Sequence, residues 1–147
     1  MSLLVREGEP QDLASIVGLL GQLGYPSDER AVAQRLERLS ADAESWVYVA
    51  LEGERVVGLA AVHVMPLLER DDPIARVTAM VVDENARGRG VGRALLARLE
   101  ELARAQGCDL IDLTSRYDRE GARAFFRRLG FEDTSLRFVK GLDLPPQ

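Results

Sequence analysis

The chain is poor in the residues that build several common kinds of site. Among its 147 residues there is one cysteine, Cys108, and one histidine, His63, and only 5% are aromatic. A single cysteine cannot form a disulfide within the chain, and one cysteine with one histidine cannot supply the ligands of a Cys/His zinc site. We therefore expect no internal disulfide and no metal. This cysteine content is typical of a reducing cytoplasm.

Long apolar runs are missing as well. No stretch approaches the roughly 18 apolar residues of a membrane-spanning helix. The opening residues, MSLLVREGEPQDL, lack the basic and apolar regions of a signal peptide. We expect a cytoplasmic protein with no membrane contact. Basic residues number 19 against 24 acidic ones, for a net charge of −5, whereas nucleic-acid-binding domains normally carry a basic excess. We therefore expect no nucleic-acid partner.

What is present is the composition of one globular domain, with 46% hydrophobic and 29% charged residues. Apolar periodicity predicts short strands alternating with helices. The predicted strands are 3–7, 46–51, 55–65, 74–83, 109–114 and 136–142, and the predicted helices are 9–24, 28–39, 91–107 and 119–130. We expect a single domain over residues 1–147, of the mixed α/β class.

Three local features carry expectations of their own. Ser27 is the predicted N-cap of the second helix, because acidic residues would then follow in its first turn. The β-branched runs 46–51 and 55–65 predict a hairpin. The run 74–83 is apolar almost throughout, which predicts a strand buried on both faces.

The segment DENARGRGVGRALL, residues 83–96, alternates glycine with arginine between a predicted strand and a predicted helix. Glycines let backbone N–H groups approach a ligand closely, and a helix N-terminus adds unpaired donors with partial positive charge. Arginine adds full charges that match phosphate geometry. The segment therefore predicts a phosphate or pyrophosphate site. The structural alternative is a glycine turn with solvated arginines.

Two well-known phosphate loops do not fit this segment. A Walker loop ends in Gly-Lys-Ser/Thr, whereas this chain has Gly92-Arg93-Ala94. The dinucleotide fingerprint Gly-x-Gly-x-x-Gly/Ala fails at its third glycine, which falls on Arg93 or Leu95. The segment therefore indicates neither a P-loop NTPase nor a nicotinamide- or flavin-dependent enzyme.

The longer segment VVDENARGRGVGRALLARLEELARAQG resembles the cofactor motif of the GNAT superfamily of acyl-CoA-dependent N-acetyltransferases. Its pattern, Arg/Gln-x-x-Gly-x-Gly/Ala, is matched by Arg87, Gly90 and Gly92. The segment REGARAFFRRLGFEDT (119–134) is similar to the family's helix with an aromatic pair before Leu-Gly-Phe. The likeness is strong over residues 74–141, and before that only the order of elements agrees. It implies a mixed, mostly antiparallel sheet flanked by helices, with parallel fourth and fifth strands that splay apart.

The resemblance implies acetyl-CoA as the co-substrate. Backbone groups of the strand before the loop would contact the pantetheine arm, and the loop N–H groups would hold the pyrophosphate. Arg119 stands where many relatives place asparagine, and it is either a phosphate or acyl contact or an exposed structural arginine. The residues assigned to the cofactor are Met80, Val81, Val82, Arg87, Gly88, Arg89, Gly90, Val91, Gly92, Arg93, Arg119 and Phe126.

The resemblance also implies direct attack of a neutral amine on the thioester, with the fourth strand's N–H groups polarising the carbonyl. Many members place a tyrosine as general acid where this chain has Phe126, which has no proton to give. Phe126 then either shapes the acyl pocket or packs in the core. Tyr117, Ser115 and Cys108 are the candidate replacements, and unaided departure of the thiolate is another route.

Histidine is the side chain whose ordinary titration lies nearest neutral pH, so His63 is the candidate base that accepts the amine's proton. The competing interpretation is a hydrogen-bonded structural histidine. Its strand leads into a charged loop in which Glu69, Asp71 and Asp72 would contact a cationic acceptor or would simply be solvated.

The leading hypothesis is an N-acetyltransferase acting on a primary amine of a small molecule or a peptide N-terminus. One alternative is a non-catalytic acyl-CoA-binding or sensing module, since the family's tyrosine is absent. Another is an acyltransferase using a longer acyl-CoA or a hydroxyl acceptor, in which Phe125 and Phe126 would line an acyl tunnel. A homodimer is expected from the resemblance alone.

Overall fold

The computed structural model describes residues 2–115 and 120–143. The chain divides into two compact units, Met1–Leu113 and Thr114–Gln147. The strands of the first unit are β1 (Leu3–Glu7), β2 (Ser45–Glu52), β3 (Arg55–Met65), β4 (Ile74–Val82) and β5 (Leu110–Leu113). Its helices are α1 (Leu13–Leu23), α2 (Glu29–Ala41) and α3 (Val91–Ala105), with short 3-10 turns η1 (Pro10–Asp12) and η2 (Glu84–Ala86).

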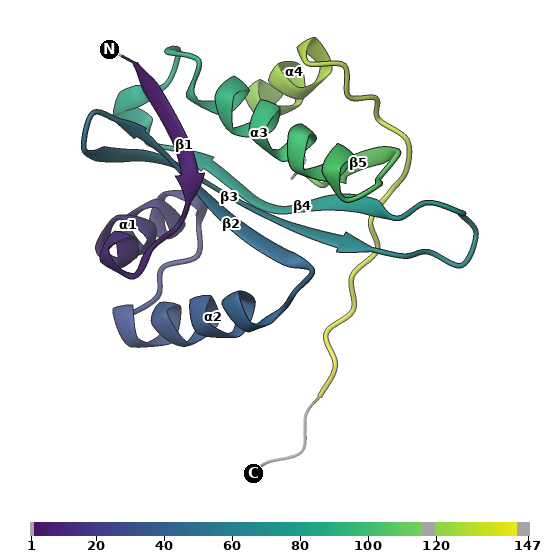
Figure 1. The fold of residues 1–147 in the computed structure, drawn as a ribbon, viewed down its shortest axis with the longest axis horizontal. Coiled ribbons are helices and arrows are strands. Elements are labelled where there is room, and N and C mark those ends of the chain that lie inside the picture. Colours follow the sequence, from purple (N-terminus) through teal and green to yellow (C-terminus); the bar gives the residue numbers. More distant parts are fainter. Residues whose placement is uncertain (1, 116–119, 144–147) are drawn as a thin grey trace. The chain divides into compact units, whose positions relative to one another are not determined.

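The strands form one sheet in chain order, β1-β2-β3-β4-β5 (Figure 1). Neighbours are antiparallel except β4 and β5, which are parallel because α3 carries the chain back between them. The predicted hairpin is confirmed, and its two-residue loop places Gly53 at φ 60°, a conformation that suits glycine. The predicted fold class, a mixed and mostly antiparallel sheet flanked by helices, is confirmed.

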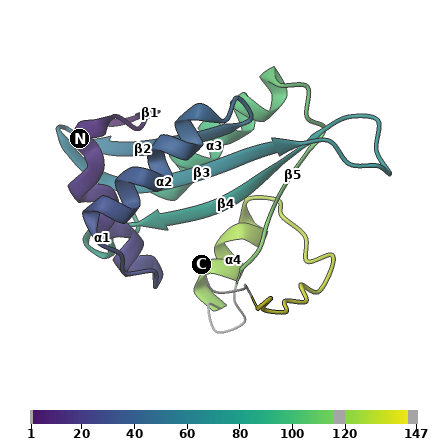
Figure 2. The same ribbon diagram turned by 90° about the horizontal axis from the view of Figure 1, so that it is seen from below.

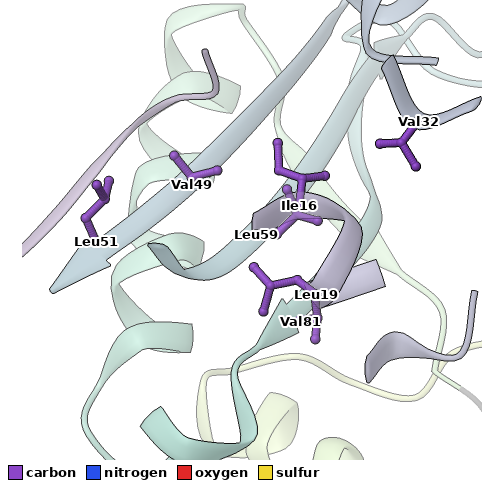
Figure 3. Close-up of a cluster of buried hydrophobic side chains, with 7 residues drawn as sticks. All are labelled: Ile16, Leu19, Val32, Val49, Leu51, Leu59 and Val81. Atoms are coloured by element: carbon purple, nitrogen blue, oxygen red, sulfur yellow. The ribbon is translucent and has the colours of Figure 1, made fainter. Parts of the chain in front are cut away.

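Helices α1 and α2 cover one face of the sheet and α3 covers the other (Figures 1 and 2). Side chains alternate between the faces, so the odd-numbered residues of β2 point toward α1 and α2. The cluster on that side is drawn in Figure 3 and consists of Ile16, Leu19, Val32, Val49, Leu51, Leu59 and Val81. This packing fixes α1 and α2 against the sheet.

Two of the local predictions are corrected. Helix α2 is capped by Asp28 rather than Ser27, because the longer carboxylate reaches the N–H of Ala31 at 2.8 Å. Strand β4 is not buried on both faces throughout, since Arg76 and Thr78 are exposed. The exposed Arg76 guanidinium binds Asp112 on the neighbouring strand.

The second unit contains α4 (Glu120–Arg128). The predicted end of this helix at Gly130 is confirmed, because Gly130 adopts φ 94° and the Phe131 N–H donates to the Phe126 carbonyl at 3.0 Å. The predicted last strand, residues 136–142, is wrong, since residues 131–143 form neither helix nor strand. A strand needs a paired neighbour, and the described part of this unit offers no other strand.

Candidate functional site

The parallel strands β4 and β5 stay paired over only part of β4. Pairing runs from Ile74 opposite Leu110 to Val77 opposite Leu113, and β4 then continues to Val82 paired with β3 but not with β5. At the same point an extra residue, Thr78, interrupts the register with β3, where Ala61 pairs with Ala79 and Val62 with Val77. Within the described residues, the second half of β4 therefore has a strand neighbour on one side only, and its backbone presents an open edge.

Backbone groups alternate along a strand, which decides which residues use that edge. The Asp83 N–H donates to the Val57 carbonyl on the β3 side at 2.8 Å. The backbone groups of Val81 therefore also point to β3, while those of Met80 and Val82 point to the open edge. The Val81 side chain lies in the core cluster of Figure 3.

The loop after β4 is held by polar contacts at its start. The carboxylate of Asp83 accepts the Asn85 N–H and the Arg55 guanidinium, both at 3.0 Å. The first of these contacts is the main reason that the pKa of Asp83 lies below its usual range. The Glu84 N–H donates to the side-chain carbonyl of Gln22 at 2.9 Å. These contacts tie the loop to β3 and α1.

The loop then turns through two left-handed glycines into α3. Gly88 has φ 80° and Gly90 has φ 83°, a region that other residues rarely adopt. The first intrahelical bond runs from the Ala94 N–H to the Gly90 carbonyl at 3.0 Å. Among the described residues, no acceptor contacts the N–H groups of Val91, Gly92 and Arg93. The helix therefore presents three free donors and its positive dipole end.

The start of α3 is set by its contact with Gly58 on β3. A Cβ at Gly58 would lie 2.8 Å from Val91 Cγ1 and 3.0 Å from Leu95 Cδ1, closer than carbon atoms pack. The missing side chain thus lets the first turn of α3 rest directly on the sheet. Sequence patterns do not reveal this contact, because it joins distant residues.

The three arginines of the loop have different surroundings. Arg87 and Arg93 are exposed, and neither forms an ion pair with an acid in the described part of the chain. Arg89 Nη1 instead binds Glu52 Oε1 at 2.9 Å, and the Glu52 side chain is only 8% exposed. Arg89 therefore neutralises a buried carboxylate at the end of β2 and anchors the loop there.

His63 lies on β3, directly opposite Ser45 on β2. Its Nδ1 is 3.0 Å from Ser45 Oγ and 3.7 Å from Asp42 Oδ2. Ser45 Oγ also donates to Asp42 Oδ2 at 2.8 Å, and the Glu44 N–H donates to Asp42 Oδ1 at 2.9 Å. The Glu44 amide and the Ser45 hydroxyl hold the pKa of Asp42 below its usual range, so this carboxylate is ionised at neutral pH.

On its other side, His63 lies opposite Arg76 on β4, and Arg76 lies opposite Asp112 on β5. Arg76 donates to both carboxylate oxygens of Asp112, at 2.9 and 2.8 Å. The four side chains Ser45, His63, Arg76 and Asp112 form a polar row on one face of the sheet, next to the point where β4 and β5 separate. Of this row, sequence patterns singled out His63 alone, because the row exists only through the strand register.

A cavity of about 760 Å³ opens near the same end of the sheet, between the start of α1, the second half of α2 and the start of β2. Asp42 and Ser45 are part of its wall, with Leu13, Leu36 and Trp46 among its apolar lining. Its volume is in the range of small-molecule sites.

Four other predicted positions are not among the described residues of the first unit. Phe126 is in the second unit, where its ring packs edge-on against Phe125 and Phe131, with centroids 5.4 and 5.7 Å apart. Ser115 belongs to the same unit. Tyr117 and Arg119 lie outside the described residues. The structure thus assigns none of these four to the surface formed by β4 and the glycine loop.

The acidic loop and Cys108 interact with charged groups close to them. Arg70 binds Asp109 at 2.8 Å, and Glu69 and Asp72 act on Arg70 through their charges. Asp71 is exposed. Burial is the main reason that the pKa of the Cys108 thiol is raised, helped by nearby acidic groups, so this thiol stays protonated at neutral pH.

Residues 2–115 and 120–143 contain neither a metal-binding cluster of three or more ligand side chains nor a helix able to span a membrane. No cluster of three or more histidine, cysteine or acidic side chains there has the arrangement to hold a metal ion. Within the same residues, no helix combines the length and apolar character required to cross a membrane.

Comparison with known proteins decides the family. Residues 16–131, most of the chain, match the Acetyltransferase (GNAT) family. The chain belongs to the GNAT acetyltransferase family. It is an acyltransferase of the N-acetyltransferase type, and acetyl-CoA is the co-substrate of this family.

Three similar proteins illustrate the relationship. An aminoalkylphosphonate N-acetyltransferase of Salmonella typhimurium is 34% identical over 143 residues, 94% of this chain and 90% of that protein. An aminoglycoside N(6')-acetyltransferase type 1 of Stenotrophomonas maltophilia is 32% identical, over 88% and 86% of the two chains. The crystal structure of a transcriptional regulator from Bacillus halodurans C-125 is similar with a TM-score of 0.89 at 25% identity, covering 96% of this chain and 100% of the other.

Proposed function

We propose that this chain transfers the acetyl group of acetyl-CoA to a primary amine by direct attack while both substrates are bound. The proposal rests on one observation: the open edge of strand β4 runs directly into a helix N-terminus that is suited to bind an anion. The open edge of β4 leads through the glycine loop into α3, whose first three N–H groups are free of acceptors among the described residues. This surface suits a ligand with an amide-bearing arm joined to a pyrophosphate.

The residues fit each part of that ligand. Backbone groups of Met80 and Val82, at the open edge, would pair with the pantetheine amides. The N–H groups from Arg87 to Gly92 and that of Arg93 would surround the pyrophosphate, with the Arg87 and Arg93 guanidiniums completing its neutralisation. Gly88 and Gly90 supply the turn, and Val91 fixes it on the sheet. Arg89 would hold the loop through Glu52.

The acceptor would approach the face that carries His63. Asp42 lies in the wall of the 760 Å³ cavity on this face. Its negative charge would attract a cationic amine, which supports this direction of approach. His63 would accept the proton that an ammonium group must lose before it attacks. The second proton lost by the nitrogen would go to the departing thiolate, which leaves as the CoA thiol. No phenolic acid is required for this balance, consistent with Phe126 replacing the family's tyrosine.

The relatives support a small-molecule acceptor. The names of the two curated relatives refer to an aminoalkylphosphonate and an aminoglycoside, and both compounds are amines that carry further polar groups. A peptide N-terminus is the second candidate class. An acceptor panel should therefore contain one member of each of these three classes.

Coenzyme binding tests the proposed phosphate site at the start of α3. Calorimetric titration with acetyl-CoA should give micromolar binding to the unaltered protein. Arg87→Ala and Arg93→Ala should each weaken it about tenfold, because each removes a charged phosphate contact. Arg104→Ala, an exposed arginine in the last turn of the same helix, is the matched control and should bind normally.

The acceptor panel then measures free thiol release. Turnover with one class, dependent on both substrates, supports the proposal. Tight binding of acetyl-CoA without turnover on any panel amine would instead favour an acyl-CoA sensor. Equal losses of acetyl-CoA affinity in Arg87→Ala and Arg104→Ala would contradict the placement of the phosphate site at the loop.

A further inference from the structure

We infer that Ser45 and Asp42 are positioning residues for His63, and that they hold its neutral ring with the proton on Nδ1. This inference rests on the proposed function for the role of His63 as a base. It adds two residues from outside every motif in the sequence, one at the end of α2 and one at the start of β2.

A count of protons decides which ring nitrogen is protonated. The Ser45 hydroxyl has one proton, and it is donated to Asp42 Oδ2 at 2.8 Å. The ionised Asp42 carboxylate can only accept hydrogen bonds. Ser45 Oγ still lies 3.0 Å from His63 Nδ1, so a hydrogen bond there requires Nδ1–H as the donor. A neutral ring with its proton on Nδ1 has a lone pair on Nε2, and Nε2 is therefore the atom free to accept a proton.

The partners of His63 are held by further hydrogen bonds, as a positioning role requires. Asp42 is the C-cap residue of α2, and its carboxylate also accepts the Glu44 N–H. The Val64 N–H donates to the Glu44 carbonyl at 2.9 Å, which ties this turn to the residue after His63. The serine and the histidine are therefore held by the pairing of β2 with β3, and the aspartate by a backbone hydrogen bond at the end of α2.

The charges around the ring suit a base that becomes positive. After Nε2 accepts a proton, Nδ1–H still points to Ser45, and Asp42 Oδ2 at 3.7 Å offsets the new charge. The other charged groups in the row are Arg76, opposite His63 on β4, and Asp112 on β5. Arg76 is itself neutralised by its two bonds to Asp112, so its opposition to a positive ring is reduced.

The chain allows a direct test, because His63 is its only histidine. Long-range ¹H–¹⁵N correlation spectra of the ¹⁵N-labelled protein, without a histidine tag and near pH ~8 where an ordinary imidazole is neutral, show which ring nitrogen carries the proton. We expect Nδ1–H in the unaltered protein and in Ser45→Thr, which keeps the hydroxyl. Ser45→Ala should shift the ring toward Nε2–H. Ser15→Ala, a serine-to-alanine change at an exposed position of α1 outside the cavity wall, should leave the spectrum unchanged.

Kinetics separates this inference from the proposed function. With the panel amine of highest turnover, Ser45→Ala should lower kcat on the order of tenfold, part of the 10²–10⁴ that a general base supplies, and should leave acetyl-CoA affinity unaltered. An Nε2–H ring in the unaltered protein, or an unchanged ring in Ser45→Ala, would overturn the positioning role even if acetyl transfer is intact. An Nδ1–H ring combined with full turnover in His63→Gln would instead remove His63 from the reaction.

Discussion

At the scale of single residues, a partly buried ion pair away from the site joins β1 to the turn before α1. Arg6 donates to both carboxylate oxygens of Asp12, at 2.7 and 3.0 Å, and the Asp12 side chain is 4% exposed. The Glu9 N–H also donates to Asp12, at 2.7 Å. The Arg6 hydrogen bond is the main reason that the pKa of Asp12 lies below its usual range. This pair fixes the first helix against the sheet that carries the site.

Asp12→Asn should therefore lower the free energy of unfolding by about 2 kcal/mol at neutral pH. A carboxyl group whose pKa is lowered by folding stabilises the protein above its unfolded pKa, near ~3.9, and this stabilisation disappears as the pH falls through the lower folded value. The difference between variant and unaltered protein should shrink as the pH falls below about 4. Urea unfolding at several pH values measures it.

Asp71→Asn is the matched control, since Asp71 is exposed, and it should be as stable as the unaltered protein at every pH. A constant deficit of Asp12→Asn across the pH range would show that the loss comes from packing rather than from the ionised carboxylate.

At the scale of elements, the first turn of α3 owes its position to Gly58. Gly58→Ala would place Cβ 2.8 Å from Val91 Cγ1, and the β-branched Val91 has little freedom to move aside. We expect a loss of about 1–3 kcal/mol in the free energy of unfolding, as for overpacked cores. The displaced helix terminus should also bind acetyl-CoA more weakly.

Gly18→Ala is the matched control for that change. Gly18 lies inside α1, and a Cβ added there would meet no atom within 4 Å beyond its own helix backbone and chain neighbours. Alanine should therefore raise stability by roughly 0.5–1 kcal/mol and leave acetyl-CoA binding alone. Equal stability and equal affinity of Gly58→Ala and the unaltered protein would mean that α3 tolerates a shift at its start.

The elements of the first unit could be predicted from periodicity because each helix buries one face against the sheet, while the central strands β2 and β3 are largely apolar runs buried on both faces. Val49, Leu51 and Leu59 alternate on their strands, while Ile16 and Leu19 recur at helical spacing. Residues 136–142 carry a similar apolar pattern and yet form no strand. Apolar alternation describes what a strand would bury, whereas strand formation also needs a paired neighbour, which a local pattern does not supply.

At the scale of the whole molecule, the two halves of the candidate site differ in how far the sequence reveals them. The glycine loop is contiguous in the sequence, so its motif identifies it directly. The row from Ser45 to Asp112 joins four strands, and its register depends on extra residues, Val57 in β3 and Thr78 in β4, that shift the pairing. Composition and motifs contain no signal for such shifts, so only His63 could be singled out.

This arrangement predicts that the two substrates protect different parts of the molecule. The N–H groups of Val91, Gly92 and Arg93 have no acceptor among the described residues, so in the free protein they should exchange with solvent rapidly. Hydrogen exchange followed by mass spectrometry should show these amides, with those of Met80 and Val82, slowed on the order of tenfold or more by saturating acetyl-CoA.

The last turn of α3, around Arg104, is the internal control, because its amides are already bonded within the helix and lie away from the loop. The acceptor amine should protect a separate set, around Asp42, Ser45 and His63, which acetyl-CoA leaves unprotected. Two ligands with separate footprints would support a complex in which both are bound before transfer. Protection around Ser45 by acetyl-CoA alone, with none in the loop, would contradict the assignment of the phosphates to the start of α3.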